Sequence, residues 1–188
     1  MMVEPSLRRG ESLEVVFSAE QIADAVDKIA NQMRATYGGD AVLLIGVLKG
    51  ATMFIGDLMR ALGDYPLAID FMIVRSYGIG RIDGSQDVRI TKDIEIDVSG
   101  QNVIIVEDIV DEGVTLNHLL EHLSKRSPKS LRACALLDKA FHRHAGVTID
   151  FIGLDAPDAF LVGYGLDHQE RFRNLPYICK LQTSAERI

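Results

Sequence analysis

The sequence predicts an α/β protein in which a mostly parallel sheet is flanked by helices. Apolar, strand-like runs alternate along the chain with amphipathic stretches of helical spacing, and this order of elements is typical of parallel sheets. The run from residue 103 to 106 contains no polar side chain, as expected of a central strand that is buried on both faces. With 188 residues, the chain is long enough for one domain with a sizeable core.

The first expected helix has clear boundaries. Ser18 and Gln21 have the spacing of a capping box, in which each side chain bonds a backbone N–H at the start of a helix. Gly38 and Gly39 end the helix. Between these limits the apolar residues recur at helical spacing, at Ile22, Val26, Ile29 and Met33.

The remaining elements follow in alternation. Helices are expected from residue 50 to about residue 62 and from residue 114 to 126. Strands are expected at residues 41–48, 67–74, 88–97, 102–106, 131–137 and 148–151. Residues 76–87 are expected to form a loop, and a loop of this length is uncommon in a compact domain unless it is functional. The first 17 residues and the segment after residue 154 do not fit the alternation.

Composition narrows the class of protein. The formal net charge is −7, whereas a nucleic-acid-binding face needs clustered basic residues. Cys134 and Cys179 lack a metal-binding spacing, which indicates buried thiols in a reducing compartment. Residues 1–10 lack the apolar segment of a signal peptide, and the longest apolar run, at residues 41–48, is too short to span a bilayer. We therefore expect a cytoplasmic protein without nucleic-acid or membrane partners.

Acidic residues and a short turn follow the central strand. Glu107 and Asp108 come directly after it, and Asp111, Gly113 and Thr115 lead into the next helix. Backbone N–H groups of such a turn favour an anion, usually phosphate, and the acids can hold a sugar diol or Mg²⁺. Acids at strand ends also occur in receiver domains, Mg²⁺-dependent phosphatases and NTPases, but the spacing here is tighter than a common turn requires.

This stretch resembles the phosphoribosyl-pyrophosphate (PRPP) signature of the type I phosphoribosyltransferases, in particular the hypoxanthine(-guanine) phosphoribosyltransferases. Further similarities occur, in the order of the family, at residues 47–50, 75–78, 137–139 and 160–175. The resemblance implies one phosphoribosyltransferase domain over residues 1–188. Its core would cover about residues 18–154, and residues 1–17 and 155–188 would form a small hood over the base.

The resemblance also implies how PRPP is held. Glu107 and Asp108 would bind the ribose hydroxyls with Mg²⁺ nearby. Adjacent side chains of a strand point to opposite faces, so both can line one site only if the strand ends there. Asp111 would move the proton of the purine ring, although it could instead cap the following helix. The 5′-phosphate cradle would consist of Asp111, Glu112, Gly113, Val114 and Thr115.

The other motifs imply groups for the leaving pyrophosphate, the base and the lid. By resemblance, Leu48, Lys49, Gly50 and Arg173 bind pyrophosphate, and the Leu48–Lys49 peptide is one that is cis in some members. Lys139 donates to O6 of the purine, Phe160 stacks on its face, and the backbone of Leu161 reads its edge. Ser76 and Tyr77 begin a flexible lid that excludes water. The metal ligands would be Glu107, Asp108 and Asp167. His142, His144 and His168 show no metal-binding spacing and receive no role.

Two residues depart from the commoner family pattern. Many members have Thr at the position of Glu112 and a polar or basic residue at that of Val114. A carboxylate facing a phosphate would oppose it, so we expect Glu112 to turn away while its backbone N–H still donates.

The sequence therefore predicts a Mg²⁺-dependent enzyme that converts PRPP and hypoxanthine, and also guanine, into IMP or GMP and pyrophosphate. By resemblance it would be a homodimer or homotetramer. Two other classes remain. One is an RNA-binding regulator on the same fold, which the acidic charge disfavours. The other is a receiver-like domain, which needs acids after its first strand, where this chain has Lys49 and Gly50.

Overall fold

The computed structural model describes residues 7–77, 87–143 and 146–183 and contains two sheets. The larger sheet has six strands in the order β4-β3-β2-β5-β6-β7. The strands are β2 (Val42–Leu48), β3 (Leu67–Tyr77), β4 (Asp87–Lys92), β5 (Asn102–Val110), β6 (Ser130–Asp138) and β7 (Phe151–Asp155). All neighbours are parallel except β3 and β4. The predicted α/β architecture with a mostly parallel sheet is confirmed.

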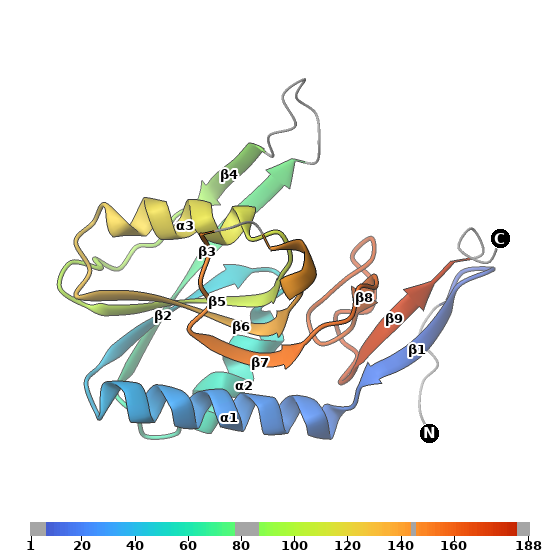
Figure 1. Cartoon of the computed structure of the whole chain (residues 1–188), viewed down its shortest axis with the longest axis horizontal. Coiled ribbons are helices and arrows are strands. Elements are labelled where there is room, and N and C mark those ends of the chain that lie inside the picture. Colours follow the sequence, from blue (N-terminus) through green and yellow to red (C-terminus); the bar gives the residue numbers. More distant parts are fainter. Residues whose placement is uncertain (1–6, 78–86, 144–145, 184–188) are drawn as a thin grey trace.

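Three helices cover this sheet on both faces. Helices α1 (Ala19–Tyr37) and α2 (Thr52–Leu62) pack on one face, and α3 (Val114–Ser124) packs on the other (Figure 1). The two faces of β5 explain why residues 103–106 carry no polar side chain. Ile104 and Val106 pack in the core under α1 and α2, whereas Val103 and Ile105 pack in the core under α3.

The first helix begins and ends where the sequence predicts. The Ser18 hydroxyl accepts from the backbone N–H of Gln21 at 3.2 Å, and the Gln21 side chain accepts from the Ser18 N–H at 2.9 Å. Gly38 ends the helix in the left-handed conformation, with φ 59°. The capping box therefore satisfies N–H groups that would otherwise lack partners at the helix start.

The terminal segments form a second, antiparallel sheet in the order β1-β9-β8. Its strands are β1 (Ser12–Phe17), β8 (Leu161–Val162) and β9 (Ile178–Gln182). This small sheet lies beyond the carboxyl ends of the parallel strands, which are the ends that carry ligand sites in such folds (Figure 1). The terminal segments thus form a sheet of their own, and its role as a hood over the base stays a prediction.

Four predicted strand boundaries are wrong. Strand β3 continues to Tyr77 and not only to residue 74, because it pairs with β4 through Ser76 and Tyr77. Strand β4 ends at Lys92 and not at residue 97, because the Asp70 carboxylate accepts the N–H groups of Glu95 and Ile96 at 2.6 and 2.9 Å and draws them out of the ladder. Strand β7 starts at Phe151, because the carboxylate of Asp150 instead accepts from the backbone of Ala133 at 2.9 Å. Strand β5 continues past the acids to Val110, which changes how the site is built.

Candidate active site

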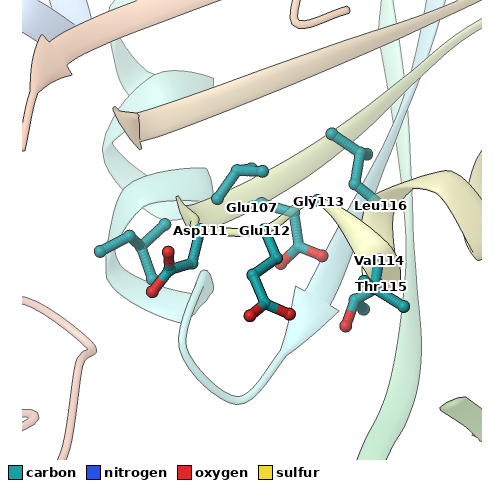
Figure 2. A pocket seen from close by; sticks show the side chains of 9 residues that line it. Glu107, Asp111, Glu112, Gly113, Val114, Thr115 and Leu116 are labelled. Atoms are coloured by element: carbon teal, nitrogen blue, oxygen red, sulfur yellow. The ribbon is translucent and has the colours of Figure 1, made fainter. Parts of the chain in front are cut away.

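A pocket of about 280 Å³ lies between the end of β5 and the start of α3. Helix α3 has 11 residues, its N-cap is Gly113 with φ 84°, and among the described residues no side chain caps it. Its first N–H groups are therefore available to an anion, as the sequence predicts for the 5′-phosphate. The pocket is lined by Glu107, Ile109, Val110, Asp111, Glu112, Gly113, Val114, Thr115 and Leu116 (Figure 2).

Asp111 does not cap this helix, because the N-cap position belongs to Gly113. The alternative structural role for Asp111 is therefore wrong, and its half-exposed side chain lies at the pocket rim. Glu112 also differs from expectation. Its side chain is partly buried among the pocket residues, and Figure 2 shows its carboxylate on the same side of the loop as that of Glu107. It does not turn away from the pocket.

Glu107 and Asp108 serve two different places, because β5 continues through both of them. Glu107 is buried and lines the pocket between β5 and α3. Asp108 lies instead against Gly50, where a Cβ atom would come within 1.7 Å of its Oδ2. The strand therefore presents one carboxylate to the pocket and the other to the loop after β2.

Burial perturbs both carboxyl groups. It raises the pKa of Glu107 well above its ordinary value, and the nearby charge of Asp108 adds to the effect. Burial also raises the pKa of Asp108 to about 6, although the backbone N–H of Ile109 bonds the carboxylate at 2.9 Å and opposes the shift. A carboxyl group with a raised pKa that lines a cavity, as Glu107 does, is a candidate for binding or catalysis.

The loop after β2 is packed between β5 and the turn that follows β8. The Leu48–Lys49 peptide is cis. Gly50 contacts Asp108 on one side, and on the other a Cβ atom at Gly165 would come within 2.0 Å of the Gly50 carbonyl oxygen. Only glycine fits such close contacts of backbone with backbone or with a carboxylate. The predicted pyrophosphate loop is thus fixed to Asp108 and to the turn at Gly165.

Lys139 meets Asp111 at the edge of the pocket. The Lys139 Nζ atom lies 3.5 Å from Asp111 Oδ2, and the Lys139 side chain is largely buried. The two residues follow the ends of neighbouring parallel strands, β6 and β5. The groups predicted to act on the base and on its proton are thus side by side.

Arg143 fixes the same corner, and the sequence analysis missed it. Its guanidinium bonds the buried Asp138 carboxylate at the end of β6, and its Nε donates to the Asp111 carbonyl oxygen at 3.3 Å. Its Cδ packs where a Cβ at Gly113 would come within 3.2 Å. The only available signal was a basic residue four positions after Lys139, which indicates no role on its own.

The turn after β8 brings together Asp167, Glu170 and Arg173. One guanidinium nitrogen of Arg173 lies 2.8 Å from Asp167 Oδ1, and another donates to the Gly165 carbonyl oxygen at 2.7 Å. Glu170 lies 3.4 Å from Arg173 and 3.1 Å from Lys49. The sequence analysis missed Glu170, although its position three residues after Asp167 and three before Arg173 was a usable signal.

The predicted base clamp lies at the start of β8. The Phe160 side chain is 50% exposed and packs edge-to-face on His168, with ring centroids 5.4 Å apart. Leu161 is buried and pairs with Lys180 in the ladder of β8 and β9. An exposed aromatic face held by a neighbouring ring is suited to stacking on a purine.

The structure describes only the start of the predicted lid. Ser76 and Tyr77 form the end of β3, and the rest of the predicted lid, residues 78–86, lies outside the described residues.

Within the described ranges, no group of three His, Cys, Asp or Glu side chains could hold a metal ion on its own. The two cysteines there are free and buried, as predicted. Across the same ranges, no helix combines the length and apolarity needed to cross a membrane.

Comparison with known proteins agrees with this arrangement. Residues 12–169 match the phosphoribosyl transferase domain family. The hypoxanthine-guanine phosphoribosyltransferase of Mycobacterium tuberculosis is 47% identical over 176 residues, which are 90% of this chain and 86% of that protein. The Bacillus subtilis enzyme of the same name is 44% identical over 165 residues, 88% of this chain and 91% of that protein.

Solved structures give the same result. The hypoxanthine phosphoribosyltransferase of Trypanosoma cruzi in complex with the product IMP is 35% identical, with a TM-score of 0.83, and the match covers 95% of this chain and 98% of that one. A hypoxanthine-guanine phosphoribosyltransferase from Bacillus anthracis is 37% identical, with a TM-score of 0.83, over 92% and 99% of the two chains. The chain therefore belongs to the phosphoribosyltransferase family, and within it to the hypoxanthine(-guanine) phosphoribosyltransferases.

Proposed function

We propose that this chain transfers the 5-phosphoribosyl group from PRPP to N9 of hypoxanthine, and also of guanine, with release of pyrophosphate. The contact between Lys139 and Asp111 beside the phosphate pocket supports this most directly. A 6-oxopurine carries O6 and N7 next to each other on one edge. An ammonium and a carboxylate 3.5 Å apart can therefore address both atoms at once.

In this proposal Lys139 selects the base and Asp111 moves the proton. Lys139 donates to O6, and its side chain is largely buried, so an unsuitable partner there is costly. Adenine would place an amino donor against the ammonium donor, and such mismatches discriminate strongly. Asp111 exchanges the proton at N7 as N9 forms its bond to the ribose C1′.

The two sides of β5 divide the binding of PRPP. The N–H groups at the start of α3 hold the 5′-phosphate, with the Thr115 hydroxyl and the backbone of Glu112 and Val114 beside them. Glu107, in the same pocket, accepts from a ribose hydroxyl. Asp108 lies on the pyrophosphate side, next to Gly50. The cations of Lys49 and Arg173 there balance the charge of the leaving group.

The donor set fits Mg²⁺. Glu107, Asp108 and Asp167 offer carboxylate oxygens, and Mg²⁺ is usually held by one or two carboxylates together with substrate oxygens and water. This agrees with the position of Glu107 and Asp108 on different sides of the strand. When bound, the ion would neutralise charge on the leaving pyrophosphate.

Residues around the base hold it in place and shield it from water. Phe160 stacks on the purine, the Leu161 backbone reads its edge, and Ser76 and Tyr77 begin a lid that excludes water.

We also propose a cytoplasmic homodimer or homotetramer. Two free thiols support a reducing compartment. A Trypanosoma cruzi relative, 35% identical with a TM-score of 0.85, has been studied for the role of its C-terminal region in oligomeric state.

A steady-state assay with PRPP, MgCl₂ and each of hypoxanthine, guanine, xanthine and adenine tests the activity. We expect turnover with hypoxanthine and guanine and none with adenine. Absence of turnover with every base, together with a shift of RNA in a gel, would instead favour an RNA-binding regulator on the same fold.

A further inference from the structure

Glu170 lies between the two cations that we assign to the leaving pyrophosphate. Its carboxylate is 3.1 Å from Lys49 Nζ and 3.4 Å from both Nε and Nη2 of Arg173. Lys49 directly follows β2 and Glu170 lies in the turn after β8, so this contact joins residues 121 positions apart in the sequence. The Glu170 carboxylate therefore pairs with both Lys49 and Arg173.

The two cations depend on Glu170 to different degrees. Arg173 is also held by the Asp167 carboxylate at 2.8 Å and by the Gly165 carbonyl oxygen at 2.7 Å. For Lys49, Glu170 is the only ion-pair partner among the described residues. If the Glu170 side chain swings away, Arg173 stays in place and Lys49 becomes free to bind another anion.

Breaking the ion pair between Lys49 and Glu170 costs little free energy. The side chains of Lys49 and Glu170 are 65% and 64% exposed, and exposed ion pairs contribute little to stability. The backbone of Glu170 is fixed independently, because its N–H donates to Asp167 Oδ2 at 2.8 Å. The carboxylate can therefore leave the cations while the turn keeps its shape.

We propose that Glu170 acts as an internal competitor of pyrophosphate, occupying Lys49 and Arg173 until the polyanion displaces it. This inference rests on the proposed function, because it assumes that pyrophosphate binds these cations. Lys49 and Arg173 contribute two positive charges and Asp167 and Glu170 two negative charges, so the attraction of these four side chains for a polyanion is reduced. Glu170 thus weakens binding of the product and speeds its release.

Isothermal titration calorimetry with sodium pyrophosphate and MgCl₂ tests this on the full chain. Glu170→Gln removes the charge, and we expect it to bind pyrophosphate about 1.5- to 5-fold more tightly than the wild type, the range of an exposed ion pair. The gain should shrink at high ionic strength. Glu170→Asn is a second neutral variant, and it suits the left-handed backbone at this position, with φ 62°.

Glu95→Gln is the matched control. Glu95 is 83% exposed and pairs with Lys92 at 3.4 Å, but it lies after β4 and away from the turn at Asp167. Its substitution changes the net charge by the same amount and should leave pyrophosphate affinity unchanged. Without ligand, all three variants should unfold at the same temperature as the wild type.

The outcomes separate this inference from the proposed function. If the wild type binds no pyrophosphate at millimolar concentration, the proposed function is wrong at this site. If the wild type binds it, and both Glu170 variants bind equally or more weakly, Glu170 orients the cations and does not compete, and the inference is overturned. A gain that Glu95→Gln reproduces would reduce the effect to net charge and would also overturn it.

Discussion

Lys139 Nζ lies 3.5 Å from Asp111 Oδ2, although 28 positions separate the two residues in the chain. The parallel pairing of β5 with β6 produces this contact, because Val110 and Asp138 are partners at the ends of these strands. The Lys139 N–H also donates to the Val110 carbonyl oxygen at 2.9 Å. The strand ends therefore hold the two side chains together before any base arrives, and such preorganisation favours catalysis.

Asp111→Asn should keep the fold and PRPP binding but lower kcat by roughly 10²–10⁴, the usual contribution of a general acid or base. The side chain is half exposed, so the amide has room and the fold should not suffer. Single-turnover kinetics, with PRPP affinity from calorimetry, measure both quantities. Asp64→Asn, an exposed aspartate after α2, is the control. Near-normal turnover in Asp111→Asn would remove Asp111 from the mechanism.

Arg143→Met should lower the free energy of unfolding by about 2–4 kcal/mol, because it leaves the buried Asp138 carboxylate without its charged partner. Adding Asp138→Asn should recover more than half of that loss, since the unpaired charge is then gone. Urea unfolding of the two single variants and the double variant gives the coupling directly. Additive losses would show that Arg143 acts only through packing on Gly113.

The raised pKa of Asp108 should make the free energy of unfolding of the metal-free protein depend on pH. Its pKa is raised from 3.8 to about 6, so the folded chain binds this proton more tightly than the unfolded chain does. The carboxyl therefore costs stability as pH rises from about 4 to about 6, and the cost persists at higher pH. Asp108→Asn, whose Oδ1 can still accept from the Ile109 N–H, should be more stable than the wild type at pH 7.5 by about 1–2 kcal/mol.

At pH 4 the difference between Asp108→Asn and the wild type should disappear. Urea unfolding in EDTA at both pH values tests this, with Asp24→Asn on the exposed face of α1 as the control. A wild type that is as stable as the variant at pH 7.5 would contradict the raised pKa.

Glu112→Thr should bind PRPP about tenfold more tightly, or ~1.4 kcal/mol, because it removes a carboxylate from the residues that line the phosphate pocket. Calorimetric titration with PRPP measures the change, and Glu121→Gln, exposed on α3, controls for net charge. An unchanged affinity would mean that the Glu112 side chain leaves the pocket when phosphate binds.

Local sequence signals predict the elements that depend on local interactions. The capping box at Ser18, the glycine at the end of α1 and the apolar run of β5 are each set by residues close in the chain. The lengths of β4 and β5 were mispredicted because distant residues decide them. Asp70 in β3 ends β4, and pairing with β6 carries β5 on through Glu107 to Val110.

The same distinction applies to the candidate site. Family motifs point to Asp111, Lys139 and Arg173, and the structure places Asp111 beside Lys139 at one corner of the site. The contacts of Gly50 with Asp108 and Gly165 depend on three segments meeting, and no local pattern encodes that meeting. Arg143 was missed because its contact with Asp111 joins two elements, whereas Glu170 had a local signal in its spacing from Asp167 and Arg173.

The most direct test of the account is kcat/KM for hypoxanthine in Lys139→Met at saturating PRPP. We expect kcat/KM for hypoxanthine to fall by about 5- to 150-fold, or ~1–3 kcal/mol, because the variant leaves O6 without a donor in a largely buried position. PRPP affinity should change little, and Lys125→Met at the end of α3 should have no effect. Equal losses for hypoxanthine and PRPP would show that Lys139 supports the fold and would contradict its role in reading the base.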